Sequence, residues 1–292
     1  MIPPDFVKKY EPILGSKMDK FLAGLETRRY SIRVNTLKTS VDWIKERLES
    51  YGWRLKRFSW LEYAFYVDSE SPGATIEHVA GFYYVQSDSS MLPVKLLEPK
   101  PGELVLDIAA SPGSKTTQMS QEMDNTGGIL ANDVSLDRIS ILYNNIKRFG
   151  ALNVAVRKSD GRRIPGKEIF DKSLVDVPCS NEASIASIRT ARNWSPEDRF
   201  SRLQKALLAA AVRLTREDGI ITYSTCTFRP EENEEVIDWA LANLPVKLEK
   251  AKAGMAHSRG LKGYECSDKV IRVWSWQGEG FFAAKLRKVS ER

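Results

Sequence analysis

Residues 103–117, E-L-V-L-D-I-A-A-S-P-G-S-K-T-T, decide the fold of this 292-residue chain. The apolar run 104–108 is interrupted only by Asp107. Small residues, a Pro-Gly turn and a segment that can continue as a helix through Met119 follow it. The pattern predicts a buried strand, a tight loop and a helix. In an open α/β sheet such a loop binds ligands, because small residues let the backbone approach and the helix presents free N–H groups.

The loop at 109–115 departs from two phosphate-binding patterns. A Walker loop would need a Gly-Lys pair and an upstream glycine, whereas Lys115 follows Ser114, and a G-x-G-x-x-G motif is also absent. The sequence therefore disfavours a nucleoside triphosphate or a dinucleotide as the ligand. Taken alone, the stretch is also compatible with an ordinary strand-to-helix turn.

Strands and helices alternate along the rest of the carboxy-terminal part. The predicted strands are 128–132, 153–157, 173–177 and 219–223, and the predicted helices are 136–149, 202–215 and 231–244. This alternation predicts a mostly parallel sheet with helices on both faces. Two further strands, 270–275 and 280–286, predict an antiparallel hairpin at the edge of the sheet.

Four acidic residues fall at the ends of predicted strands: Asp107, Asp133, Asp160 and Asp176. A carboxylate after the second strand is suited to bind ribose hydroxyls, because it offers paired acceptors in a fixed position. Any one of them could instead be a helix cap or a turn residue. Four at successive strand ends favour a ligand site.

The amino-terminal part predicts a separate α+β unit, with residues 1–90 as one domain and 91–292 as the other. Two short helices within 6–25 precede a predicted β-α-β unit, whose elements are the strand 30–37, the helix 41–50 and the strand 54–67. Its basic residues are Arg28, Arg29, Arg33, Lys38, Arg54, Lys56 and Arg57, and they alternate with Tyr30, Trp53, Phe58 and Trp60. Such a mixture is typical of an RNA-binding surface, but also of a solvated basic face over an aromatic core.

Composition narrows the class of protein further. The chain has 44 basic and 38 acidic residues, which favours a polyanionic partner. It shows neither a bilayer-spanning apolar segment nor a signal peptide, so we expect a cytoplasmic protein and no membrane partner. Cys179, Cys226 and Cys266 form no C-x-x-C pair and only two histidines accompany them, so we expect no metal site and no disulfide framework.

Six motifs together resemble the RNA cytosine-C5 methyltransferases of the Nop2/Sun (RsmB/RsmF) type. They are S-I-R-V-N-T-L-K at 31–38, Q-S-D-S-S-M-L-P at 86–93, A-A-S-P-G-S-K-T at 109–116, D-V-P-C-S at 176–180, Y-S-T-C-T at 223–227 and P-E-E-N-E at 230–234. The resemblance implies a class I, Rossmann-like methyltransferase fold, S-adenosylmethionine as methyl donor and a cytosine in structured RNA as acceptor. The chain departs from the family pattern at four positions: Ser111, Ser114, Asn181 and Ala183.

The chemistry of this family requires a nucleophilic cysteine. C5 of cytosine is a poor nucleophile, and a thiolate that adds at C6 makes C5 reactive. The resemblance favours Cys226, in the Thr-Cys pair, as this nucleophile, with Cys179 assisting release of the product. In the DNA enzymes the cysteine of the Pro-Cys pair, here Cys179, is the nucleophile instead. Alternatively, Cys226 could serve only as a small buried apolar residue at the end of a strand.

The resemblance also implies the roles of the remaining site residues. Asp176 would bind the N3/N4 edge of the cytosine, and Lys115 would supply positive charge near the thiolate or position Asp176. The implied cofactor contacts come from Ala109, Ala110, Ser111, Pro112, Gly113, Ser114, Lys115, Asp133, Arg138, Asp160 and Asp176.

The sequence leaves the RNA substrate open. We expect transfer RNA, because beyond the amino-terminal unit the chain shows no additional RNA-binding module, with ribosomal RNA as the alternative. A third hypothesis is an RNA-binding assembly factor that uses the methyltransferase domain as a scaffold, which retention of both cysteines, Lys115 and Asp176 disfavours. We expect a monomer.

Overall fold

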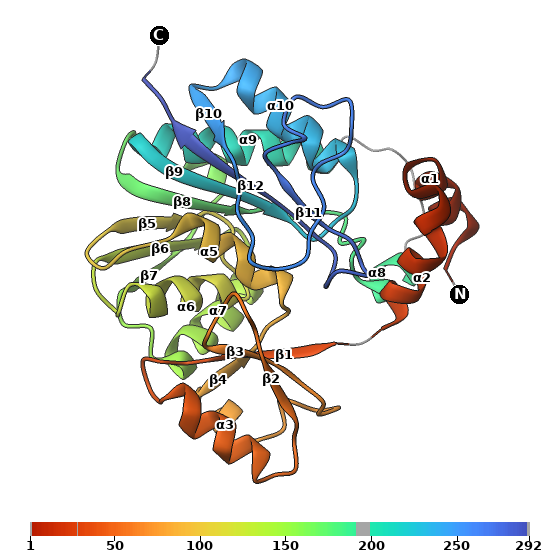
Figure 1. Cartoon of the computed structure of the whole chain (residues 1–292). Helices are drawn as coiled ribbons and strands as arrows, with labels where there is room; N and C mark the ends of the chain where they lie inside the picture. Colours follow the sequence, from red (N-terminus) through yellow and green to blue (C-terminus); the bar gives the residue numbers. More distant parts are fainter. Residues whose placement is uncertain (1, 28, 191–198, 291–292) are drawn as a thin grey trace.

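The computed structural model describes residues 2–27, 29–190 and 199–290, and Arg28 of the predicted basic cluster lies outside them. The larger of its two sheets has the strand order β10-β12-β9-β8-β5-β6-β7, with β11 paired to β12 (Figure 1). The strands are β5 (Leu104–Asp107), β6 (Gly128–Asp133), β7 (Val154–Lys158), β8 (Phe170–Asp176), β9 (Thr215–Thr225), β10 (Val246–Glu249), β11 (Ile271–Val273) and β12 (Phe281–Lys288).

The central strands of this sheet are parallel, as the alternating pattern predicts. β5 pairs in parallel with β6 and β8, and β8 with β9. The predicted antiparallel pair is also present, since β11 pairs with the first half of β12. β12, however, lies inside the sheet, antiparallel to both β9 and β10. The edge strand β10 is short, and the sequence analysis did not predict it.

Helices cover both faces of the sheet. Neighbouring residues of β8 show this, because Leu174 belongs to one apolar cluster and Val175 to another. Leu174 packs with α5 (Leu92–Leu97) and α6 (Ser114–Glu122), and Val175 with α9 (Arg199–Leu214) and α10 (Glu234–Asn243). α7 (Leu136–Phe149) packs on the same face as α6 through Leu142 and Ile146.

The second sheet is a four-stranded antiparallel sheet rather than the predicted β-α-β unit. Its order is β2-β3-β1-β4. The segment expected to be one strand, 54–67, turns at its middle into a hairpin of two strands, and a further strand precedes the part of the chain that forms the larger sheet. The elements are β1 (Tyr30–Val34), α3 (Val41–Glu49), β2 (Leu55–Arg57), β3 (Ala64–Val67), α4 (Ile76–Val79) and β4 (Tyr83–Val85).

The first two helices pack against the part of the chain that contains the larger sheet. α1 (Pro4–Leu14) and α2 (Met18–Glu26) lie beside α8 (Ile185–Thr190) in Figure 1. The Phe21 ring is 4.9 Å from that of Phe228, and the Tyr10 hydroxyl donates a hydrogen bond to Glu182. Residues 4–26 thus contribute to the core next to β9, although they precede the small sheet in sequence. The division at residue 90 stays a prediction.

Buried Arg33 joins the small sheet to α6, which packs on the larger sheet. From β1 it donates hydrogen bonds to Gln86 Oε1 at 2.9 Å and Gln121 Oε1 at 2.6 Å. It also donates to Thr117 Oγ1 at 2.8 Å and to the Ser114 carbonyl at 3.2 Å. Burial lowers the pKa of its guanidinium to about 10, so the group remains charged at neutral pH. This position corrects the expectation that Arg33 belongs to a surface that binds phosphates.

No helix within the described ranges has both the length and the apolarity needed to cross a bilayer.

Replacing Arg33 by Met should lower the free energy of unfolding by about 3 kcal/mol or more, because several buried acceptors lose their donor. Urea unfolding monitored by tryptophan fluorescence measures this. Arg57→Met is the matched control, since Arg57 forms an exposed pair with Asp42, and such pairs contribute about 0–1 kcal/mol. Equal losses in both variants would contradict the structural role of Arg33.

Candidate active site

Two cysteines meet at the carboxyl ends of neighbouring strands. Cys179 follows β8 and Cys226 follows β9, and the parallel register places Asp176 beside Ser224. The two sulfur atoms are 3.1 Å apart. The sequence analysis named both cysteines for one site, and the structure brings them together. Cys266 lies elsewhere, buried in the cluster formed by α9 and α10.

The two thiols have different surroundings. The hydrogen bond with Cys226, followed by burial, raises the pKa of the Cys179 thiol well above its usual range. Cys179 therefore keeps its proton at neutral pH. The Cys226 thiol also donates a hydrogen bond to Asn181 Oδ1 at 3.1 Å. Asn181 has φ +53°, a conformation that glycine adopts freely and asparagine better than most residues.

Lys115 and Asp176 form an ion pair beside the cysteines. Lys115 Nζ lies 2.8 Å from Asp176 Oδ2 and donates to Ser90 Oγ at 3.1 Å. Burial lowers the pKa of the Lys115 ammonium, but the attraction of Asp176 outweighs it, and Cys226 adds to that attraction, so the net shift is upward. Ser224 Oγ donates to the other carboxylate oxygen of Asp176 at 2.7 Å. The lysine is thus a fixed positive charge.

The predicted cofactor loop connects β5 to α6. Gly113 has φ +100°, and a Cβ there would lie 2.9 Å from Leu142 Cδ1, so the turn requires glycine. Within the loop, Ala110 N–H donates to the Asn132 carbonyl at 2.8 Å. The first turn of α6, at Ser114–Thr116, then provides N–H groups without intrahelical acceptors.

Asp133 fixes the loop from the end of β6. It accepts hydrogen bonds from Ser111 N–H at 3.3 Å and from Arg138 Nε at 3.1 Å. Arg138 in turn donates to the Ser111 carbonyl at 2.8 Å. Asp160, after β7, pairs with Arg162 through both carboxylate oxygens. The structure therefore gathers Asp133 and Arg138 around the loop, and commits Asp160 to Arg162.

Two family descriptions match most of the chain. Residues 94–287 match 16S rRNA methyltransferase RsmB/F, and residues 2–88 match the N-terminal domain of 16S rRNA methyltransferase RsmF. This chain belongs to the RsmB/F methyltransferase family. The resemblance seen in the sequence motifs and the predicted class I fold are thereby confirmed.

Individual RsmB/F relatives support the same assignment. The ribosomal RNA small subunit methyltransferase F of Klebsiella pneumoniae (strain 342) is 40% identical over 93% of this chain, which spans 60% of that relative's length. A crystallised methyltransferase homolog protein from Pyrococcus horikoshii is 35% identical, with a TM-score of 0.85 over 97% of this chain and 94% of that one. NSun6 from the same organism, solved with SFG, is 25% identical, with a TM-score of 0.91 over 99% of each chain.

RsmB/F enzymes use S-adenosylmethionine, and the charges at the strand ends suit that molecule. Burial, with smaller contributions from the neighbouring carboxylates Asp176 and Asp133, raises the pKa of the Asp107 carboxyl to about 7 against the opposing effects of Thr116 and Lys115. A site crowded with carboxylates favours a ligand that carries positive charge. S-adenosylmethionine carries a positively charged sulfonium and an ammonium group. Its ribose hydroxyls can also donate hydrogen bonds to carboxylates.

Sequence reasoning missed some parts of this RsmB/F site. Ser90 holds Lys115, and the Phe281 ring centroid lies 5.6 Å from the lysine Nζ. Ser90 lies in the quoted motif at 86–93, so a hydroxyl there was a usable signal. The contact of Asn181 with Cys226 had no signal beyond the departure from a family glycine.

Asp107→Asn should change how stability depends on pH. The folded-state pKa of Asp107, about 7, lies above its unfolded value near 3.9, so its protonated form stabilises the fold at low pH. That contribution is lost as the pH rises from about 4 to 7. Asparagine cannot ionise, so the variant should gain roughly 1–4 kcal/mol relative to the original chain over this range.

Urea titrations of both proteins between pH 4 and 8 measure this difference. Parallel curves over the whole range would show that Asp107 is ionised in the fold.

Proposed function

We propose that this protein transfers a methyl group from S-adenosylmethionine to C5 of a cytosine in RNA through a covalent bond between Cys226 and C6. The observation that carries the proposal is the pair of thiols 3.1 Å apart beside the Lys115–Asp176 ion pair. A covalent nucleophile divides one difficult step into easier ones, which the weak nucleophilicity of C5 demands.

Cys226 is the nucleophile in this proposal. Its thiolate adds to C6, the Sγ–C6 bond forms, and electron density moves to C5. S-adenosylmethionine, when bound, supplies the methyl group that C5 takes up. A base then removes the C5 proton, the Sγ–C6 bond breaks and the Cys226 thiolate is restored. The fixed positive charge of Lys115 stabilises the Cys226 thiolate both before it attacks C6 and after it is released.

Cys179 assists the departure of Cys226. Its raised pKa keeps it a thiol at neutral pH, and its sulfur lies within hydrogen-bonding distance of the sulfur that must leave. A thiol that donates to the departing sulfur stabilises the negative charge that develops there. In this proposal Cys226 forms the covalent bond to the base, and Cys179 helps to break it.

Asp176 and Lys115 bind the reacting base. With Ser224 on one oxygen and Lys115 on the other, the Asp176 carboxylate is held in one orientation. In that orientation it can accept a hydrogen bond from the N4 amino group, and from N3 once N3 takes up a proton as C6 is attacked. Lys115 is thus a positioning residue for Asp176 and a source of charge for Cys226, which combines the two roles that the sequence left open.

The cofactor would be held by the loop from Ala109 to Lys115, with Asp133 and Arg138 next to the ribose. Asp133 can serve because it lies at the end of β6 and already orders the loop. Asp160 would contact the adenine only where Arg162 leaves a carboxylate oxygen accessible. Within the described ranges, no group of three metal-ligating side chains accompanies these residues.

Ribosomal RNA is the substrate that we propose, since the curated relatives named above are small-subunit rRNA methyltransferases. Transfer RNA, which the sequence analysis favoured, stays a prediction and is the alternative to this proposal. That the protein is a cytoplasmic monomer also stays a prediction. A scaffold role would leave the charged Lys115–Asp176 pair and the paired thiols without a use. Transfer of labelled methyl groups to purified ribosomal and transfer RNA separates the three hypotheses, because a scaffold would bind without turnover.

The two cysteine variants should block different steps, formation of the covalent adduct in one and its breakdown in the other. Cys226→Ala should abolish methylation and form no covalent RNA adduct. Cys179→Ala should still attack and transfer the methyl group, yet accumulate an adduct that resists denaturant. Denaturing gels with labelled RNA measure both, and the double variant is the control. An adduct that persists in Cys226→Ala and is absent from Cys179→Ala would assign the nucleophile to Cys179.

Asp133→Ala should weaken binding of S-adenosylmethionine, because a charge-assisted hydrogen bond contributes about 1.5–3 kcal/mol. RNA affinity should change little. Titration calorimetry measures donor binding, and Asp133→Asn tests whether the charge or the loop geometry matters. Unaltered donor affinity in both variants would exclude Asp133 from the cofactor site.

A further inference from the structure

Most of the basic residues in the predicted amino-terminal cluster have hydrogen-bond or ion-pair partners within the protein. Lys38 donates to the carbonyls of Ala80 and Arg148, and Arg33 is buried against α6. Arg54 pairs with Asp68 at 2.6 Å, and Arg57 pairs with Asp42 at 2.9 Å.

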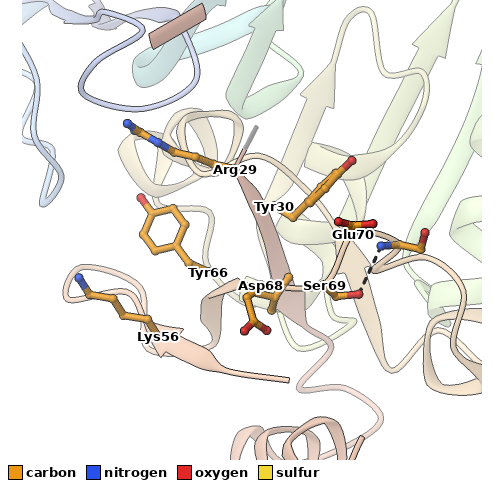
Figure 2. A pocket seen from close by; sticks show the side chains of 9 residues that line it. Arg29, Tyr30, Lys56, Tyr66, Asp68, Ser69 and Glu70 are labelled. Atoms are coloured by element: carbon orange, nitrogen blue, oxygen red, sulfur yellow. Dashed lines mark hydrogen bonds between the residues drawn. The ribbon is translucent and has the colours of Figure 1, made fainter. Parts of the chain in front are cut away.

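Two exposed cations of the predicted cluster remain. Within the part of the chain that the structure describes, Arg29 and Lys56 form no ion pair and no side-chain hydrogen bond. Both line the same hollow, of about 890 Å³, at the end of strands β1 and β3. Figure 2 shows Arg29, Lys56 and the Tyr66 ring on one side of the strands, and Tyr30 and Glu70 on the other.

Strand register explains why these side chains meet. Lys56 pairs with Tyr66, and Tyr66 pairs with Ser31, so the three form a row across β2, β3 and β1. Side chains in such a row lie on one face of a sheet. That face is the one from which Arg33, two residues beyond Ser31, reaches α6.

Tyr66 is held as a rigid platform. Its hydroxyl donates to Asp88 Oδ2 at 2.8 Å, and its ring centroid lies 4.4 Å from that of Phe58. Both contacts fix the ring before any ligand arrives, so little conformational entropy is lost when a base stacks on it.

The hollow continues toward the active site. Arg29 and Tyr30 also line a second hollow of about 360 Å³, whose other wall includes Ala183 and Glu279. Ala183 N–H donates to the Cys226 carbonyl at 3.1 Å. Asp88, the partner of Tyr66, accepts from Glu279 N–H at 3.1 Å. The two hollows therefore adjoin at Arg29 and Tyr30, and Ala183 in the wall of the second contacts the backbone of Cys226.

We propose that Arg29, Lys56 and Tyr66 bind a single-stranded RNA nucleotide flanking the target cytosine, with the base on Tyr66 and phosphates on the two cations. The proposal rests on the proposed function, since the second hollow is walled by Ala183 next to Cys226. Three acidic residues lie nearby. Asp68 pairs with Arg54, and Glu70 lies on the other side of the strands (Figure 2). Asp88 is buried and accepts hydrogen bonds from the Tyr66 hydroxyl and Glu279 N–H.

Adjacent residues of β2 provide a matched pair of variants. Lys56→Gln and Arg57→Gln remove the same charge, but Lys56 shares the face of Tyr66, whereas Arg57 pairs with Phe65 and lies on the other face. Binding of a fluorescein-labelled 12-nucleotide single-stranded RNA with one cytosine is measured by anisotropy between 50 and 200 mM KCl. Lys56→Gln should reduce the slope of log K against log salt by about 0.7, and Arg57→Gln should leave it unchanged.

The ring is tested separately from the charge. Tyr66→Leu keeps an apolar side chain against Phe58 but removes the stacking surface, and should weaken binding about five- to 150-fold. Tyr66→Phe loses only the bond to Asp88 and should stay within about twofold. Equal slopes for Lys56→Gln and Arg57→Gln, or equal affinities for both Tyr66 variants, would overturn the proposal.

Methyl transfer measured on the same proteins keeps the two proposals distinct. If the original chain methylates RNA but Lys56→Gln behaves as Arg57→Gln does, the nucleotide site is wrong and the proposed function stands. If the slope changes as expected but no methyl group is transferred, the nucleotide site stands and the proposed function is wrong.

Discussion

The fold depends on one buried charge, the Arg33 guanidinium. It is fully buried, and every acceptor that receives its hydrogen bonds is neutral. A buried charge is costly unless all its donors are used, so the small sheet and α6 must keep one relative position to satisfy it. The Phe149 ring, 4.5 Å from the guanidinium, adds a cation–π contact from α7.

This constraint reaches the candidate catalytic residues through a chain of hydrogen-bonded side chains. Gln86 accepts from Arg33 and donates to the Ser90 carbonyl at 3.3 Å, and the Ser90 hydroxyl accepts from Lys115. Lys115 then orients Asp176. The amino-terminal sheet is thus part of the framework of the candidate active site as well as a surface beside it.

The other side of the cysteine pair is held by the first helix. Glu182, next to Asn181, is buried and receives hydrogen bonds from Tyr10 and from Arg229 at 2.6 Å. The loop that carries Cys179 is therefore fixed from two directions. This rigidity accommodates Asn181 where the family pattern has glycine, because asparagine tolerates a positive φ and its amide can reach Cys226.

Local patterns in the sequence predicted the parallel sheet and the strand, loop and helix at 103–117, and the resemblance of its motifs to a known family singled out the candidate site residues. Each depends on nearest neighbours: an apolar run gives a strand, Gly113 gives a turn, and motif spacing places Cys179 and Cys226 at strand ends. Tertiary structure alone decided that 54–67 folds as a hairpin, that β12 lies inside the sheet and that Arg33 is buried while Lys56 is exposed. Arginine and lysine look alike in a sequence, but their partners come from residues far along the chain. Only the packing of the amino-terminal sheet against α6 determines which positive charge is desolvated and which remains exposed.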